Sequence, residues 1–250
     1  MLDATPITKT RKPNLVILSG AGLSADSGIQ TFRGSDGLWE GHDVMKVANG
    51  LTWKQNWDLV RQFYNARRAN IGTAEPNAMH RLIADWEQRY DIVNLTQNID
   101  DLLERGGCKT VHHLHGELTK MRCDACGNVW DIGYNAVSDT DRCNGKNGTC
   151  NSLKGVRPKV VFFHEPAPLY SLMYHAIKNL TAQDCLVVIG TSGLVIDVNS
   201  LVFDCKALKI LNNLESSEHI NEDYFDHVFL GKASEQAVAI DTVVTNYMSN

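Results

Sequence analysis

The sequence lacks the features that define several large protein classes. Its 250 residues carry 24 Lys and Arg against 29 Asp and Glu, so a net charge of −5 leaves no positive excess for binding a nucleic acid. No apolar run approaches the roughly 18 residues of a membrane-spanning helix, and residues 1–13 have no apolar core of a signal peptide. No repeat or low-complexity tract is present. We therefore expect a cytoplasmic monomer that binds neither nucleic acid nor membrane.

The seven cysteines are an odd number, which does not suit a disulfide scaffold and favours a reducing compartment. Four of them form two pairs, with two residues inside the first pair, six inside the second and a hairpin-sized stretch between: Cys123, Cys126, Cys143 and Cys150. Four thiolates so spaced suit a tetrahedral structural zinc ion, and the alternative is four unrelated reduced cysteines. The other three lie in or near apolar runs and are expected in the core: Cys108, Cys185 and Cys205.

A glycine-rich loop follows residues 14–19, an apolar run with the length of a buried strand. Gly20 and Gly22 let the backbone adopt a positive φ or approach a ligand closely, and N–H groups at the start of a following helix can bind a pyrophosphate. The spacing differs from the G-x-G-x-x-G fingerprint, because the next glycine is Gly28. From these residues alone, a nucleotide site and an ordinary strand-to-helix turn are both open.

Strand-like segments alternate with helical ones along most of the chain. Strands are expected at residues 14–19, 91–96, 110–114, 157–165, 184–190 and 208–212. This alternation predicts an α/β fold with a doubly wound, Rossmann-like parallel sheet. Residues 40–87 are helical in pattern and residues 121–156 hold the four paired cysteines. We interpret these two segments as insertions that form a smaller lobe, helical plus zinc ribbon, so that residues 1–39, 88–120 and 157–250 make the main domain.

One expected helix carries a stripe of large side chains at three- and four-residue steps: Trp53, Trp57, Val60, Tyr64 and Arg67. On spacing alone, the stripe is a core face that ends in a snorkelling arginine. Arg68 lies about 100° further round the helix and is expected to tolerate substitution. A second helix is expected to begin at Asn77, which follows Pro76 as a helix N-cap.

Polar side chains follow the strands at 91–96 and 110–114, where an open parallel sheet binds its ligands. Gln97, Asn98 and Asp100 come directly after the first of these strands, and His115 comes after the second. His112 and His113 lie close by, so a histidine at this strand end could be a metal ligand, a structural hydrogen-bonding group or a catalytic base.

Residues 20–34 resemble the NAD-binding signature of the sirtuins, with Gln30 where that family usually has proline. Residues 96–100, 113–117 and 190–192 match further sirtuin motifs in the same order. The resemblance extends from residue 14 to residue 236 and implies an NAD-binding main domain and a structural zinc ion in the small lobe. The positions that match NAD contacts of the family are Gly20, Ala21, Gly22, Ser24, Asp26, Ser27, Gly28, Thr31, Phe32, Arg33, Gln97, Asn98, Asp100, Gly190, Thr191, Ser192, Asn213 and Ala233.

The resemblance implies an NAD-dependent protein-lysine deacylase that acts on acylated lysine in proteins or peptides. In that mechanism the acyl oxygen attacks the ribose carbon and displaces nicotinamide, and His115, which matches the family's catalytic histidine, deprotonates a ribose hydroxyl. The products are nicotinamide, free lysine and O-acyl-ADP-ribose.

The stripe acquires a second interpretation from this resemblance. Tyr64 and Arg67 match the Tyr-x-x-Arg motif of class III sirtuins, which accept succinyl and malonyl groups, and Ala48 matches a small residue that leaves room for them. A carboxylate in an apolar slot needs a fixed cation, which a guanidinium beside a phenol provides. Val161 and Phe162 complete the expected substrate contacts.

One position departs from the family pattern. His164 stands where sirtuins usually have a glycine that lets the substrate backbone pair alongside. With an imidazole there, either the substrate strand shifts outward or the enzyme prefers a different or smaller acylated substrate, and the sequence leaves both open. The imidazole also favours an alternative enzyme, an NAD glycohydrolase or ADP-ribosyltransferase that uses the same pocket. A further alternative is a non-catalytic NAD-sensing module, against which the presence of Gln97, Asn98, Asp100 and His115 together argues.

Overall fold

The computed structural model describes residues 13–30, 38–39, 41–145 and 148–249. Three of the expected NAD contacts, Thr31, Phe32 and Arg33, lie outside these residues.

The centre of the molecule is a six-stranded parallel sheet in the order β11-β10-β9-β1-β4-β5. The bounds of its strands are β1 Asn14–Ser19, β4 Asp91–Thr96, β5 His112–His113, β9 Cys185–Ile189, β10 Leu208–Asn213 and β11 His227–Leu230. The expected Rossmann-like parallel sheet is confirmed. The strand expected at 110–114 is only two residues long, and β11 was not foreseen.

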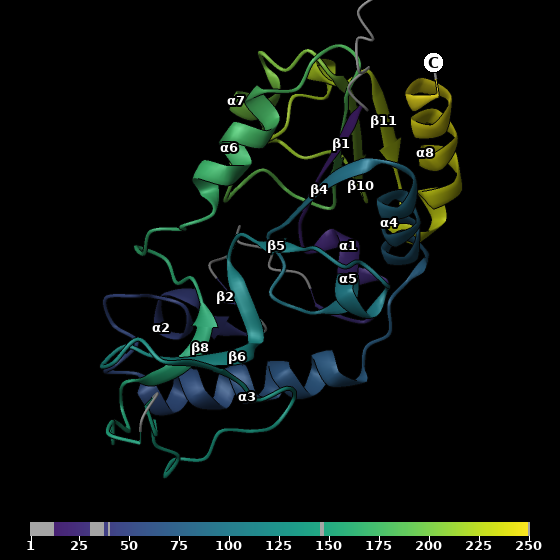
Figure 1. Ribbon diagram of the computed structural model, residues 1–250. Coiled ribbons are helices and arrows are strands. Elements are labelled where there is room, and N and C mark those ends of the chain that lie inside the picture. The colour runs from purple at the N-terminus through teal and green to yellow at the C-terminus, as the bar shows by residue number, and fades with distance from the viewer. Residues whose placement is uncertain (1–12, 31–37, 40, 146–147, 250) are drawn as a thin grey trace, which may run out of the picture.

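Helices cover both faces of this sheet (Figure 1). α4 (Ala78–Arg89) and α8 (Ala233–Met248) pack on one face, while α6 (Tyr170–Lys178) and α7 (Val198–Val202) pack on the other. The side chains of β1 alternate between the two cores: Leu15 and Ile17 join the α4 side, and Val16 and Leu18 join the α6 side. A strand buried on both faces explains the continuous apolar run in the sequence. Among the described residues, no helix combines the length and apolarity needed to cross a bilayer.

A separate antiparallel sheet, in the order β7-β6-β8, lies beside the long helix α3 (Trp57–Thr73). Its strands are β6 Gly116–Cys123, β7 Val129–Asp131 and β8 Val156–Val160. The strand that we expected at residues 157–165 is β8, which ends at Val160 and pairs with β6. We predicted domain boundaries at 120/121 and 156/157, and these positions fall within β6 and β8. The boundaries stay a prediction. The remaining elements are α1 Gly22–Ala25, β2 Leu38–Trp39, β3 His42–Asp43, α2 Val44–Val47, α5 Leu102–Arg105 and the 3₁₀ turn Glu222–Tyr224.

Both expected helices exist, with one correction. α3 begins at Trp57, so Trp53 lies in the turn before it, although its ring packs in the same core as Trp57 and Tyr64. Asn77 is the N-cap of α4 and accepts hydrogen bonds from the N–H groups of Met79 and His80, at 3.0 and 3.4 Å. The His80 ring accepts the N–H of Asn77 at 3.2 Å in return, which makes a reciprocal capping box.

Candidate active site

The glycine-rich loop after β1 packs directly against the loop after β9. The N–H groups of Gly20 and Gly22 donate to the carbonyls of Ile189 and Gly190, each at 2.8 Å. A Cβ on Gly22 would lie 2.6 Å from the Cα of Gly190, and one on Gly20 would lie 2.7 Å from its carbonyl oxygen. Gly190 itself has φ +63°. Close approach of the two loops thus requires these three glycines.

A buried polar cluster lies beneath this loop. The Ser24 hydroxyl donates to the Asp100 carboxylate at 3.0 Å and accepts from the Asn98 amide at 3.1 Å. All three residues are buried, and burial raises the pKa of Asp100 although the N–H of Leu102 and the Ser24 hydroxyl lower it. His80 lies 3.4 Å from the Ser24 oxygen, and burial, aided by the charge of Arg81, lowers the pKa of His80 to about 4. The hydroxyl of Ser24, the amide of Asn98 and the carboxyl of Asp100 therefore form a hydrogen-bonded group that lies beyond the ends of β1 and β4.

Other expected NAD contacts meet at the same edge of the sheet. The Gln97 amide donates to the Thr191 hydroxyl at 3.0 Å, and the Asn213 amide donates to the Thr191 carbonyl at 2.9 Å. Asp26 accepts the N–H and the hydroxyl of Ser234, next to Ala233 in the first turn of α8. Further members of the expected set that the structure places in these loops are Ala21, Ser27, Gly28 and Ser192.

His115 lies between β5 and β6, and its ring is bonded on both sides. One ring nitrogen, Nδ1, lies 3.1 Å from the carbonyl oxygen of Gln97, and the other, Nε2, lies 2.8 Å from the hydroxyl of Tyr170. Burial lowers the pKa of His115, and the Gln97 carbonyl opposes this effect. The ring is thus neutral near pH 7 and can take up a proton.

His113 is a structural hydrogen-bonding residue. Its ring lies 2.8 Å from the carbonyl oxygen of Asn98 and 2.8 Å from the Glu104 carboxylate. Burial lowers the pKa of His113, but the bond and charge of Glu104, together with the Asn98 carbonyl and the charge of Glu117, leave the pKa above its ordinary value. From the sequence alone, this structural role was open to His112, His113 and His115.

The expected acyl site lies between α3 and the segment after β8. Tyr64 is fully buried and stacks on Phe162 with 5.8 Å between ring centroids, and the Arg67 guanidinium lies 4.8 Å from the centroid of Trp39. Ala48 belongs to the same core, and its carbonyl accepts the N–H of Phe163. Burial raises the pKa of Tyr64, against the charges of Arg157 and Arg67. Within the described part of the chain, the Tyr64 hydroxyl is buried and has no hydrogen-bond partner.

An ion pair between the buried Arg157 and the half-buried Glu165 supports the wall of this site, and we did not predict it from the sequence. Arg157 donates to both oxygens of Glu165 at 2.6 Å, and its guanidinium lies 3.9 Å from the centroid of Phe162. Glu165 also accepts the N–H of Phe162 at 2.9 Å. The pair therefore orients Phe162 and the preceding Val161, whose N–H donates to the His115 carbonyl.

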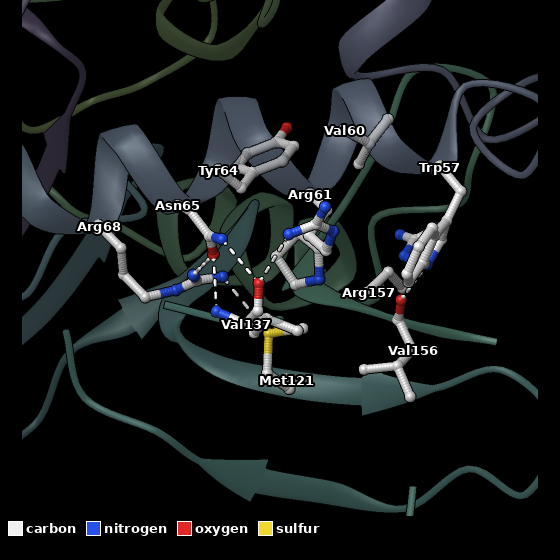
Figure 2. Close-up of a pocket in the computed structure, with 11 residues that line it drawn as sticks. Trp57, Val60, Arg61, Tyr64, Asn65, Arg68, Met121, Val137, Val156 and Arg157 are labelled. Atoms are coloured by element: carbon white, nitrogen blue, oxygen red, sulfur yellow. Dashed lines mark hydrogen bonds between the residues drawn. The ribbon is translucent and has the colours of Figure 1, made fainter. Parts of the chain in front are cut away.

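The opposite face of α3 contacts residues of the cysteine-containing insertion, 121–156, as Figure 2 shows for Asn65 and Val137. Asn65 exchanges two hydrogen bonds with the backbone of Val137, at 2.8 and 2.9 Å, and Arg61 donates to the same carbonyl. The cavity at this contact is about 10 Å³, roughly the space that one water needs, so it is packing and not a ligand site. Tyr64 carries its hydroxyl away from it (Figure 2).

Arg68 corrects an expectation. It is buried rather than solvent-facing, donates to the Leu118 carbonyl at 2.9 Å and to Asn65 at 2.7 Å, and burial lowers its pKa to about 10. We expected Arg68 to tolerate substitution, and its burial makes that expectation wrong, because removing it would leave buried acceptors unpaired. Helical spacing had suggested a single buried face, whereas α3 is packed on two sides.

The four paired cysteines converge at the end of β6. Their sulfur atoms all lie within 4.8 Å of one another, with Cys123 3.9 Å from Cys150 and Cys126 3.6 Å from Cys143. A tetrahedron with Zn–S bonds of about 2.3 Å has sulfur atoms about 3.8 Å apart, so this donor set fits a closed structural zinc site. In the described residues, these cysteines form the one group of three or more metal-binding side chains.

The comparison with known proteins decides the family. The family model described as "Sir2 family" matches residues 20–197. The chain belongs to the Sir2 family. A Sir2 relative from Helicobacter hepaticus, named NAD-dependent protein deacylase, is 40% identical over 249 residues, which cover 91% of this chain and 95% of the relative.

Two solved Sir2 structures have the same fold. A Sir2 homologue in complex with ADP-ribose matches with a TM-score of 0.80 and 32% identity, covering 94% of this chain and 93% of the homologue. A Sir2 structure with a deacetylated p53 peptide and 3′-O-acetyl ADP-ribose matches with a TM-score of 0.73 and 26% identity, covering 92% of each chain. The Sir2 fold predicted from the sequence is therefore confirmed.

Proposed function

We propose that this chain is an NAD-dependent protein-lysine deacylase, the activity for which its relatives are named. The observation that best supports the proposal is the neutral, half-buried ring of His115, which is bonded to the carbonyl of Gln97, the residue before Asn98 of the polar cluster. In this proposal the loops after β1, β4 and β9 bind NAD, and His115 takes a proton from a ribose hydroxyl. A base of this kind needs a nitrogen lone pair and shielding from water, and the half-buried position of the ring provides part of the shielding.

The substrate is proposed to be acylated lysine in a protein or peptide, and acidic acyl groups are proposed to be accepted. A succinyl or malonyl carboxylate that reaches Tyr64 and Arg67 would find a hydroxyl donor and a guanidinium in an apolar wall built by Trp39 and Phe162. Charge-assisted hydrogen bonds are strong in such surroundings. The cytoplasmic location and the monomeric state stay predictions from the sequence.

One incubation tests the activity. The protein is mixed with NAD and either an acetyl-lysine or a succinyl-lysine peptide of the same sequence, and O-acyl-ADP-ribose and free ADP-ribose are measured separately. A deacylase produces O-acyl-ADP-ribose and nicotinamide in equal amounts. Free ADP-ribose that forms without peptide consumption would instead identify an NAD glycohydrolase, the alternative that His164 favours. No consumption of NAD would support a binding module.

Arg67→Met tests the acyl preference. Loss of a charge-assisted bond, worth about 1.5–3 kcal/mol, is expected to lower kcat/KM for desuccinylation by about ten- to a hundredfold. Deacetylation should change little, because an acetyl group has no carboxylate. Steady-state kinetics with the two peptides measure the ratio. Gln62→Met, on the exposed side of the same helix, is the control. Equal loss of both activities would show that Arg67 acts through packing and would end the acidic-acyl proposal.

His164 has the only positive φ among the described non-glycine residues, +67°, and its side chain is exposed. We expect His164→Gly to raise kcat/KM for a long acyl-peptide by about tenfold, equivalent to ~1.4 kcal/mol, because glycine adopts this φ freely and removes the ring from the proposed path of the peptide. Turnover of a single acyl-lysine should stay the same. His164→Ala removes the ring but keeps the strained backbone and so separates the two causes. A lower kcat/KM for the peptide in both variants would mean that the imidazole binds substrate.

A further inference from the structure

Tyr170 is positioned to control the base nitrogen of His115. Its hydroxyl lies 2.8 Å from His115 Nε2, while Nδ1 lies 3.1 Å from the carbonyl oxygen of Gln97. A carbonyl only accepts hydrogen bonds, so Nδ1 carries the proton of the neutral ring and Nε2 carries the lone pair. The phenol is therefore the donor to Nε2. The atom that must receive a proton during catalysis is already occupied.

The fold holds this hydroxyl in place. Tyr170 is the first residue of α6, its N–H donates to the Ala167 carbonyl at 3.1 Å, and its ring is half-buried against the sheet core. Met173 and Ile177 on the same helix are buried in that core, which fixes the helix. The ring of Tyr174 contacts that of Tyr170 edge-on, with 6.4 Å between centroids. The contact with His115 is thus made by a packed helix.

The surroundings keep both partners neutral near pH 7. Burial lowers the pKa of His115, and burial together with Tyr174 raises that of Tyr170. The nearby charged groups are engaged elsewhere: Asp100 with Ser24, His113 with Glu104, and Glu117 with Lys120 and Lys159. Within the described residues, the hydrogen bonds of the His115 ring go to Gln97 and Tyr170 alone.

We propose that Tyr170 is a positioning residue for His115. In the free enzyme its hydroxyl holds the lone pair on His115 Nε2, and the ribose hydroxyl must displace the Tyr170 hydroxyl when NAD binds. The inference rests on the proposed role of His115 as the base. A single lone pair accepts one hydrogen bond, so the phenol and the ribose hydroxyl compete for it. The exchange breaks no covalent bond. The ribose proton moves to Nε2 only after the phenol has left.

Tyr170→Phe removes the competitor and keeps the ring. A neutral hydrogen bond contributes about two- to tenfold to an equilibrium, so Kd and KM for NAD should fall by that factor while kcat stays within about twofold. The phenol stabilises the neutral imidazole, so its loss raises the pKa of His115 in the free enzyme. In the pH profile of kcat/KM, the apparent pKa on the acid side should rise by up to about one unit. In the pH profile of kcat, that pKa should stay the same, because the phenol is already displaced in the complex.

Tyr174→Phe is the matched control, since it removes a hydroxyl one turn away on the same helix and should change neither NAD binding nor either pH limb. Calorimetry with NAD and ¹⁵N NMR of the His115 ring give readouts that do not need turnover. If wild type is active and Tyr170→Phe leaves Kd, KM and the limb of kcat/KM unchanged, the inference is wrong. A tenfold or larger loss of kcat would also overturn it, because Tyr170 would then carry the proton. A wild type that makes no O-acyl-ADP-ribose refutes the proposed function instead.

Discussion

His115→Ala is expected to lower deacylation by about 10²- to 10⁴-fold, the usual loss when a positioned base is removed. NAD affinity should change by no more than about tenfold, because the imidazole offers the ribose one neutral hydrogen bond at Nε2, which replaces its bond to Tyr170. Single-turnover production of O-acyl-ADP-ribose measures the chemical step, and calorimetry measures NAD binding.

The control for this experiment is His227→Ala, which alters an exposed histidine on β11, at the opposite edge of the sheet from β5. It should leave the rate unchanged. Turnover of the acyl-peptide within a few-fold of wild type in His115→Ala would show that another group is the base. The neighbouring His113 is the next residue to examine, although its bonds to Asn98 and Glu104 occupy both ring nitrogens.

Cys143→Ala is expected to bind less than one zinc ion per chain and to lose folded protein. Structural zinc supplies folding free energy on the order of 10 kcal/mol. The three remaining thiolates would bind zinc less tightly, so the lobe would lose part of that folding free energy. Metal analysis of purified protein and urea denaturation measure the two effects. Cys205→Ala, which alters a half-buried cysteine outside the cluster, should keep its zinc. Stoichiometric zinc in the Cys143→Ala variant would contradict the assignment.

The features that the sequence predicted well depend on neighbours in the chain. The strand at 14–19 is a continuous apolar run, the cap at Asn77 needs only the next three residues, and the cysteine cluster follows from spacing. Each of these uses a short-range rule of geometry, so no knowledge of the tertiary structure was needed. The parallel sheet followed from the alternation of such local segments.

The features that it did not predict depend on residues far apart. Tyr170 reaches His115 across 55 positions, and nothing near Tyr170 in the sequence indicates that contact. The strand at 156–160 was recognisable, but its antiparallel partner was not. β5 stops after two residues because the chain turns toward β6 at Gly116, where φ is +89° and a Cβ would lie 2.1 Å from the Lys159 carbonyl oxygen. Arg68 was misjudged because helical spacing does not show that a second layer covers the helix.

The contact between the loops after β1 and β9 changes how variants of the glycine-rich loop should be interpreted. Gly20 and Gly22 are required by the backbone of Gly190, with contacts of 2.7 and 2.6 Å to a hypothetical Cβ. A Gly22→Ala enzyme would therefore lose NAD turnover by forcing two strand ends apart, whether or not the glycine touches a phosphate. Alanine scanning at these positions measures the fit between the two loops. The nucleotide contacts are better tested at Gln97, whose half-buried side chain lies outside this glycine contact.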